Sequence, residues 1–319
     1  MISKEVIVLR EKILFIGGKG GVGKSTSAAA IALMLAQQQK KTLLVSTDPA
    51  HNIGDIFHQP LKNQPIEVFP MLFALEIDPG IETKKYIKKV KENIQGVVKS
   101  HMQSEVFRQI DLASSTPGAE EASLFDRIVS IIIDEGENYD HIVFDTAPTG
   151  HTIRLLTLPE IMGVWIDGML ERRKKRNETY TQLLNDGDPI EDPIITVLQH
   201  RKQRFMNVRH ILLNKKQTGF IFILNAERLS ILETSKAIKM LAAHQLNVHT
   251  LFVNKILSEN DESQFWKKRQ QTEREYLKWI ETEFVNQEKH YIPLFETDIH
   301  SISLLKKFAN YLKEHISIY

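Results

Sequence analysis

A glycine-rich segment near the start of the chain combines the residue types that bind phosphate. It reads Gly17-Gly18-Lys19-Gly20-Gly21-Val22-Gly23-Lys24-Ser25-Thr26, and its spacing matches the P-loop pattern G-x-x-x-x-G-K-[ST]. Glycines let backbone N–H groups turn inward around phosphate oxygens, and the N-terminus of a following helix adds a partial positive charge. The segment is therefore predicted to bind the phosphates of a nucleotide.

The side chains of this turn have separate expected tasks. Lys24 would reach the β- and γ-phosphates, and the Ser25 hydroxyl would ligate Mg²⁺. The glycines also fit the pattern G-x-G-x-x-G with Asp48 about 25 residues on, so a Rossmann dinucleotide site is the competing interpretation. A Rossmann turn has no use for Lys-Ser at that position, which favours the P-loop. The residues expected at the nucleotide are Gly18, Lys19, Gly20, Gly21, Val22, Gly23, Lys24, Ser25 and Thr26.

Lys19 is a second lysine inside the same turn. It cannot easily reach the phosphates that Lys24 contacts, so a second copy of the protein could use it. The other interpretation is a solvated lysine on an exposed turn, and the residues alone leave both open.

Two aspartates follow apolar runs that have the pattern of strands. One begins Asp48-Pro49-Ala50-His51-Asn52, and the other begins Asp145-Thr146-Ala147-Pro148-Thr149-Gly150-His151. Ligands bind at the carboxyl edge of an open α/β sheet, where such residues meet. Asp145 is predicted to hold Mg²⁺ through water, and Asp48 to orient or deprotonate the attacking water. Alternatively, Asp-Pro starts a turn, or either aspartate caps a helix.

Positioning these groups requires strands and helices in alternation. Apolar, β-branched runs occur at 13–16, 42–46, 72–77, 141–144, 219–224 and 250–253, as expected for strands covered on both faces. A buried helix is predicted from Ser25 to Gln38, and another is predicted to open at Ser230, with Glu233 completing a capping box. The predicted fold is therefore α/β, a P-loop NTPase with a mostly parallel, doubly wound sheet.

Strand signals vanish between Leu158 and Lys216, where basic and acidic helical stretches flank a loop with prolines. We interpret this part as a helical insertion in the α/β body. The chain is accordingly predicted to be a single P-loop domain over residues 1–319, with a helical subdomain at about 80–125 and 158–216.

Composition excludes several classes of protein. The chain has 41 Lys and Arg against 40 Asp and Glu, a net charge of +1, which argues against nucleic acid as a partner. It has no cysteine, which excludes disulfides, thiolate zinc sites and iron-sulfur clusters. Neither a signal peptide nor a run of roughly 18 apolar residues is evident, so the expected compartment is the cytoplasm.

Three segments resemble the deviant P-loop, switch I and switch II of the ArsA family. They are the segments that run from Lys19 to Thr26, from Asp48 to Asn52 and from Asp145 to Thr152. The family comprises arsenite-pump-driving ATPases and guided-entry ATPases that deliver tail-anchored membrane proteins. Pro117-Gly118-Ala119-Glu120-Glu121 and Asn225-Ala226-Glu227-Arg228-Leu229-Ser230 also resemble family segments, so the resemblance runs from about Ile13 to the C-terminus.

The resemblance implies a Mg²⁺-dependent ATP hydrolase, a homodimeric nucleotide switch that couples ATP hydrolysis to the handling of a client. It implies that Lys19 crosses the dimer interface to the partner's phosphates and that Asp48 is the catalytic carboxylate.

Three further positions match the family. Glu227 resembles a glutamate near the nucleotide at the dimer interface, Asn254 an adenine-reading asparagine, and Pro293 part of the adenine-side loop. Asn254 also fits a turn residue at the end of a strand.

The chain departs from the family in ways that bear on its client. Without cysteine it cannot bind arsenite through thiolates, and it lacks the Cys-x-x-Cys pair with which guided-entry dimers commonly share a zinc ion. The apolar run from Ile161 to Ile166 stands where the family has its client groove, although core or dimer packing is the preferred interpretation. The sequence therefore leaves the identity of the client undecided between a protein and a membrane, which the chain would reach peripherally through a partner.

A second functional hypothesis is an ATP-gated switch like MinD or ParA, which positions itself on a membrane or a partner. Its support is an amphipathic C-terminal helix in which apolar residues such as Leu304, Phe308 and Leu312 stand beside lysines. Docking of this helix on the sheet is the preferred interpretation.

Overall fold

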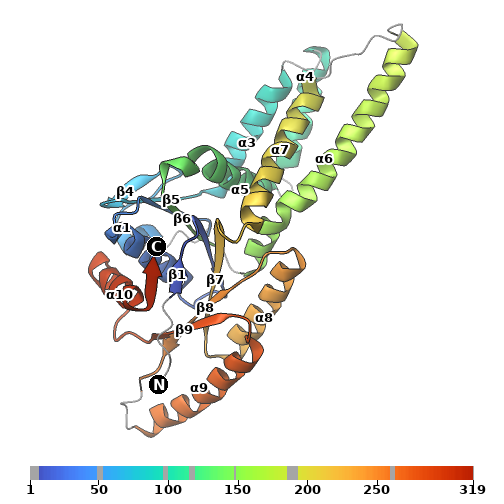
Figure 1. Ribbon diagram of the computed structural model, residues 1–319. Coiled ribbons are helices and arrows are strands. Elements are labelled where there is room, and N and C mark those ends of the chain that lie inside the picture. The colour runs from blue at the N-terminus through green and yellow to red at the C-terminus, as the bar shows by residue number, and fades with distance from the viewer. Residues whose placement is uncertain are drawn as a thin grey trace. The chain divides into compact units, whose positions relative to one another are not determined.

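The computed structural model describes residues 7–48, 53–95, 100–114, 119–146, 149–184, 193–258 and 263–318 (Figure 1). The chain divides into two compact units. The α/β unit comprises Met1–Asp78, Glu137–Arg154 and Leu212–Tyr319, and the helical unit comprises Pro79–Gly136 and Leu155–Ile211.

An eight-stranded sheet forms the centre of the α/β unit, with strand order β4-β5-β3-β6-β2-β7-β8-β9. All neighbouring strands are parallel except β4 and β5, which confirms the predicted fold class. The strands are β2 (Ile13–Gly18), β3 (Thr42–Ser46), β4 (Ile66–Phe69), β5 (Leu72–Glu76), β6 (His141–Asp145), β7 (Thr218–Asn225), β8 (Thr250–Ile256) and β9 (Glu288–Pro293).

All six predicted strands are present in this sheet, but its two edge strands were not predicted. β4 and β9 are only partly buried, so neither carries the continuous apolar run that marks a strand covered on both faces. A separate parallel pair, β1 (Ile7–Leu9) and β10 (Ile316–Ile318), joins the two ends of the described chain and was also not predicted.

The helices of the α/β unit show how burial follows from sequence. These helices are α1 (Lys24–Gln37), α2 (Ile53–Phe57), α8 (Arg228–Ala243), α9 (Gln264–Glu283) and α10 (Ile302–His315). In α1 every residue from Ser27 to Ala36 is buried, as its almost wholly apolar sequence predicts.

The predicted start of α8 was wrong. The helix begins two residues before Ser230, and Glu227 is its N-cap residue, without a side-chain cap. The hydroxyl of Ser230 instead accepts a hydrogen bond from the N–H of Asn225 at 3.1 Å. Glu233 therefore does not complete a capping box.

The apolar face of α10 packs against α1 within the α/β core. Leu305, Phe308 and Leu312 are each no more than 2% exposed and belong to the core cluster that includes α1. The C-terminal helix is thus docked in the core, as predicted, but mainly on α1 and not on the sheet. Its buried apolar residues give no support to membrane attachment. None of the described helices is long and apolar enough to cross a membrane.

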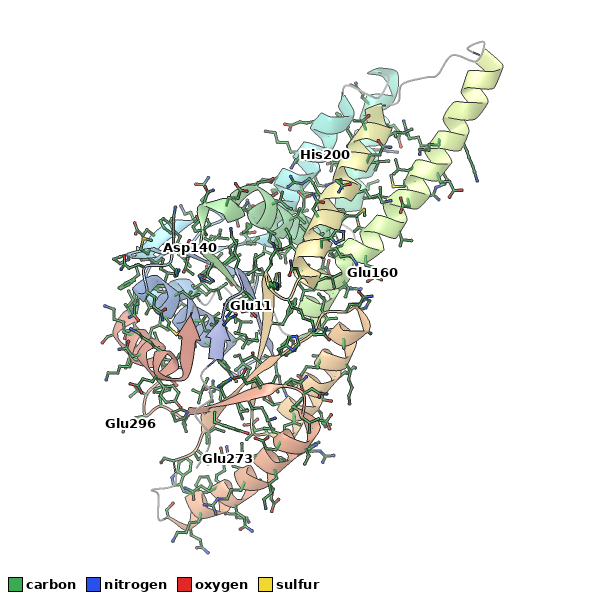
Figure 2. The ribbon with its side chains drawn as sticks, in the orientation of Figure 1. Glu11, Asp140, Glu160, His200, Glu273 and Glu296 are labelled. Atoms are coloured by element: carbon green, nitrogen blue, oxygen red, sulfur yellow. The ribbon has the colours of Figure 1, made fainter. Side chains whose placement is uncertain are left out.

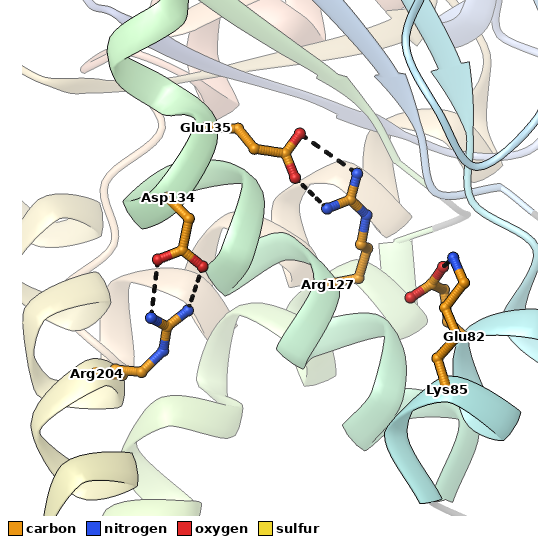
Figure 3. Close-up of polar contacts among 6 residues, drawn as sticks. All are labelled: Glu82, Lys85, Arg127, Asp134, Glu135 and Arg204. Carbon is orange, nitrogen blue, oxygen red and sulfur yellow. Dashed lines mark hydrogen bonds and ion pairs between the residues drawn. The ribbon is translucent and has the colours of Figure 1, made fainter. Parts of the chain in front are cut away.

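The helical unit contains α3 (Pro79–Gln95), α4 (Ser100–Ser114), α5 (Ala119–Ser130), and most of α6 (Thr149–Leu184) and α7 (Pro193–Leu213). The described part of its core includes Phe125 and Phe205, whose rings lie 5.4 Å apart. In the run expected at a client groove, Ile166 is buried and Val164 is 72% exposed. Ion pairs supplement this core, and Figure 3 shows Arg204 bound to Asp134 through two hydrogen bonds of 2.9 and 2.7 Å.

Candidate functional site

The phosphate-binding turn connects β2 to α1 and is shaped by the strands beside it. Gly18 has φ +146°, and a Cβ atom there would lie 2.3 Å from the carbonyl oxygen of Ile223 on β7. Gly23 has φ +97°, and its Cβ would lie 2.6 Å from Nδ2 of Asn254 on β8. Both positions require glycine, because an L side chain would be strained and would collide with a neighbouring strand.

A pocket of about 530 Å³ opens at this turn. Its size lies within the range typical of small-molecule sites. Of the predicted site residues, those that line it are Gly20, Gly21, Gly23, Lys24, Ser25, Thr26, Asp48, Asn254 and Pro293. Gly18 and Val22 are buried in the wall of the turn, whereas Lys19, Asp145 and Glu227 do not line the pocket.

Lys24 is the first residue of α1 and is only 6% exposed. Its ammonium donates a hydrogen bond to the carbonyl oxygen of Lys19 at 3.2 Å, which folds the side chain back along the turn. Burial lowers the pKa of Lys24, and the nearby carboxylates of Asp145 and Asp48 oppose this shift. The arrangement places a cation where the backbone turn would surround phosphate oxygens.

Asp145 ends β6 and is 1% exposed. Burial raises its pKa to about 7, against the influence of the Ser25 hydroxyl and the Lys24 ammonium. Neither carboxylate oxygen has a hydrogen-bond partner within normal geometry among the described residues. A buried carboxylate left in this state is costly, and a cation would satisfy it.

The residues around Asp145 fit Mg²⁺. The carboxylate of Asp145 and the hydroxyl of Ser25 are hard oxygen donors, which Mg²⁺ prefers. In the described part of the chain, no group of three or more His, Cys, Asp or Glu residues could hold a metal ion. The remaining ligands would therefore be phosphate oxygens and water, the usual composition of a Mg²⁺ site at a nucleotide.

Asp48 lies just beyond β3, partly buried, and lines the pocket. Its N–H donates to the hydroxyl of Ser46 at 3.3 Å. The rest of its motif, residues 49–52, lies outside the described residues, as do residues 147–148 of the second motif and 117–118 of the acidic segment.

A third carboxylate at this edge of the sheet was missed in the sequence. Glu76 ends β5, is 7% exposed, and accepts a hydrogen bond from the N–H of Gly54 at 2.9 Å. It pairs in register with Ser46, which pairs in turn with Asp145. The signal was available, because Asp78-Pro79-Gly80 follows this apolar run as a turn, but the sequence prediction placed Glu76 inside the strand at 72–77.

Asn254 lies on β8 and fastens the turn to that strand. Its Nδ2 donates to the carbonyl oxygen of Val22 at 2.8 Å, and its Oδ1 accepts from the N–H of Lys255 at 2.9 Å. An amide has two donors and two acceptor positions, so each end retains one further bonding position, and Asn254 lines the pocket.

Lys19 and Glu227 face other surroundings. The ammonium of Lys19 forms an ion pair with Glu233 on α8 at 3.3 Å. Glu227 is exposed and lines a second pocket of about 820 Å³, together with α9 residues that include Trp266 and Glu273. Figure 2 labels Glu273 on α9. Burial raises the pKa of Glu273, whose carboxylate accepts from the N–H of Leu257 at 3.2 Å.

The two pockets are neighbours. Lys255 and Leu294 line both of them, and Leu294 is 46% exposed. The structure thus gathers the P-loop, Asp48, Asn254 and Pro293 at one pocket and leaves Glu227 at the adjacent one.

Comparison with known proteins agrees with this arrangement. A family model described as anion-transporting ATPase, ArsA_ATPase, matches residues 11–314. A protein of Aquifex aeolicus provisionally named arsenical pump-driving ATPase 2 is 32% identical over 301 residues, which cover 94% of this chain and 99% of that protein.

Eukaryotic relatives show comparable similarity. An ATPase ASNA1 homolog of Paramecium tetraurelia is 31% identical over 94% of this chain and 93% of its own length. The ATPase GET3 of Mycosarcoma maydis is 31% identical over 94% of this chain and 90% of its own length. With the P-loop, the parallel sheet and nearly the whole chain matched, this protein is an ATPase that belongs to the ArsA family of anion-transporting ATPases.

Proposed function

We propose that this ATPase depends on Mg²⁺, works as a homodimer, and uses its nucleotide state to bind and release a protein client. The observation that carries the proposal is Asp145, a buried carboxylate without hydrogen-bond partners in the described chain, beside Ser25 and Lys24 at the P-loop. The three groups together match what a nucleotide with its metal ion requires.

In this proposal the chain's own groups bind and orient the triphosphate. Backbone N–H groups from Gly20 to Thr26 surround the phosphates, and Lys24 contacts the β- and γ-phosphate oxygens. Asp145 and Ser25 would hold Mg²⁺, whose positive charge would offset the negative charge of the phosphate oxygens. Asn254 and Pro293, on the pocket wall, would contact the adenine.

Asp48 is proposed to orient and deprotonate the attacking water. It is the aspartate of the pocket that follows β3 directly, and its backbone is held by Ser46 at 3.3 Å. In-line attack on the γ-phosphate requires such a group within hydrogen-bond reach of the water.

The proposed dimer uses Lys19 and Glu227. Lys19 does not line the pocket of its own chain and pairs with Glu233, which is consistent with use of its ammonium at a partner's phosphates. Glu227, exposed at the start of α8, would lie near the same interface.

The client is proposed to bind the helical unit. The arrangement of this unit is proposed to change with the bound nucleotide. The name of the Aquifex relative refers to an arsenical pump, but this chain has no cysteine, so arsenite could not be held by thiolates. A protein client in the cytoplasm, with peripheral attachment to a membrane through a partner, is the proposed setting.

The first experiment replaces the proposed catalytic carboxylate. Asp48→Asn is expected to reduce ATP turnover by about 100-fold or more while ATP affinity changes by less than about threefold, because general base catalysis is lost and the phosphate contacts remain. Phosphate release and binding of a fluorescent ATP analogue measure the two quantities. Asp55→Asn, at an exposed aspartate of the same pocket, is the matched control. Normal turnover in Asp48→Asn would refute the role of Asp48.

A second experiment tests the dimer. Light scattering with and without Mg-ATP should show a dimer that ATP promotes, and Lys19→Ala should lose turnover. Lys236→Ala, at an exposed lysine on α8, should leave dimer formation and ATP turnover unchanged. A monomer that hydrolyses ATP equally well as wild type and as Lys19→Ala would contradict the paired-site proposal.

A further inference from the structure

Glu76 is a buried carboxylate to which the proposed mechanism gives no task. It is 7% exposed at the carboxyl end of β5, the strand that neighbours β3, and Asp48 lies two residues beyond the end of β3. Burying a carboxylate costs free energy unless hydrogen bonds compensate it. Glu76 meets this condition partly through the N–H of Gly54, 2.9 Å from its Oε1.

Two side chains at adjacent positions of the sheet, those of Ser46 and Glu76, accept hydrogen bonds from the chain at and after Asp48. Ser46 and Glu76 are register partners on β3 and β5. The hydroxyl of Ser46 accepts from the N–H of Asp48 at 3.3 Å, and the carboxylate of Glu76 accepts from the N–H of Gly54 at 2.9 Å. Asp48 and Gly54, which lie on either side of residues 49–52, are therefore each hydrogen-bonded to a strand of the sheet or to its end.

The far attachment is closely packed. Gly54 belongs to α2, whose neighbouring residues Ile53 and Phe57 are no more than 1% exposed. A Cβ at Gly54 would lie 2.9 Å from the carbonyl oxygen of Gln59 and 3.7 Å from Oε1 of Glu76. The contact between Glu76 and Gly54 thus sits where the backbone has little freedom to shift.

We propose that Glu76 is a positioning residue for ATP hydrolysis, which holds α2 to the sheet so that Asp48 keeps its orientation toward the attacking water. This inference rests on the proposed role of Asp48. Misplacement of a catalytic group by about 1 Å can cost on the order of 100-fold in rate, so loss of the hydrogen bond that holds α2 should lower turnover and leave phosphate binding unchanged.

The test compares substitutions that differ in one property. Glu76→Gln removes the charge and keeps an oxygen that accepts from Gly54. Glu76→Met removes the charge and the acceptor at nearly the same length. Glu76→Met should lower kcat on the order of tenfold with KM for ATP within about twofold, whereas Glu76→Gln should stay within about threefold of wild type.

Two controls separate positioning from general loss of structure. Glu67→Gln changes an exposed carboxylate on β4 that accepts from the N–H of Met71 at 3.3 Å and should leave kcat unchanged. If Glu76→Met does not fold, as judged by circular dichroism, Glu76→Asp replaces it. Glu76→Asp retains the charge but is one methylene too short to reach Gly54, and should lower kcat as Glu76→Met does.

A double variant identifies the residue through which Glu76 acts. Adding Glu76→Met to Asp48→Asn should cause no further loss of kcat, because the carboxylate that Glu76 is proposed to position is already absent. Equal kcat in Glu76→Gln and Glu76→Met, or additive losses in the double variant, would overturn the inference. If Asp48→Asn itself hydrolyses ATP normally, the proposed function fails independently of Glu76.

Discussion

The two units of this chain are stabilised in different ways. In the α/β unit, α1 buries an unbroken run from Ser27 to Ala36 against strands that are apolar on both faces. In the helical unit, partly exposed ion pairs accompany the apolar core. Arg204 binds Asp134 with two hydrogen bonds, and Arg127 binds Glu135 (Figure 3).

The difference shows which parts of the protein are built to keep their geometry. Stabilisation by buried apolar surface is not screened by salt as an ion pair is, and close packing fixes the positions of the strands. The turn that holds Lys24 connects one of these strands to α1, so its geometry is fixed by the same packing. Exposed ion pairs contribute only about 0–1 kcal/mol each and are screened by salt. The helical unit is accordingly expected to open at lower free energy than the α/β unit.

The largest effect is expected from Gly18→Ala in the α/β unit. A Cβ at Gly18 would lie 2.3 Å from a backbone carbonyl, so the free energy of unfolding should fall by about 2–4 kcal/mol and ATP binding should be lost. Urea unfolding measures the change. Gly20→Ala is the control, because a Cβ there would meet nothing within 4 Å, and its stability should change by less than about 0.5 kcal/mol. Equal stability of the two variants would contradict the packing argument.

The next effect concerns Asp145 and pH. Burial raises its pKa from 3.8 to about 7, so between these values the folded protein holds a proton that the unfolded chain has released. Its contribution to the free energy of unfolding therefore falls as pH rises from about 4 to 7 and is lost above 7. Asp145→Asn should remove this slope and, without Mg²⁺, stabilise the protein at pH 8 on the order of 1–3 kcal/mol.

Denaturant unfolding at several pH values, with and without Mg²⁺, tests this prediction. Mg²⁺ should stabilise the wild type at pH 8 and leave Asp145→Asn unchanged. Asp298→Asn, at an exposed aspartate of the same pocket, serves as the control. The same pH slope in wild type and Asp145→Asn would show that Asp145 does not titrate as described.

A smaller effect is expected in the helical unit. Arg204→Gln removes the two hydrogen bonds to Asp134, whose pKa Arg204 holds below its usual value. Because the pair is partly exposed, hydrogen exchange of α7 should report a loss of about 1 kcal/mol or less, which about 1 M salt abolishes. Lys175→Gln, which breaks an exposed pair with Glu171, should change nothing measurable. A loss that persists in high salt would show that Arg204 acts through packing.

The smallest effect is expected at the pair between Lys19 and Glu233. Both side chains are partly exposed, at 31% and 45%, so the pair is worth roughly 0.5 kcal/mol. Glu233→Gln should raise ATP-dependent dimer formation by no more than about threefold, since Lys19 no longer has to leave a partner. Sedimentation at several protein concentrations measures this, with Glu275→Gln on α9 as control. Weaker dimerisation in Glu233→Gln would instead show that the glutamate belongs to the interface.

The sequence alone determined the phosphate-binding turn and the central strands. Both are local patterns: glycine spacing before Lys24 and Ser25 requires one backbone shape, and short, β-branched apolar runs are typical of strands covered on both faces. The edge strands β4 and β9 were not predicted, because they are partly exposed and so lack a continuous apolar run.

Only the tertiary structure decided which distant residues meet at the turn. Asn254 reaches the carbonyl of Val22, 232 residues away in the chain, because β8 lies two strands from β2. Glu76 enters the site because β5 pairs with β3, and Glu233 meets Lys19 where a capping box had been predicted. Such contacts depend on strand order and register, which are set when the whole sheet assembles. The spacing of residues within a local motif does not predict them.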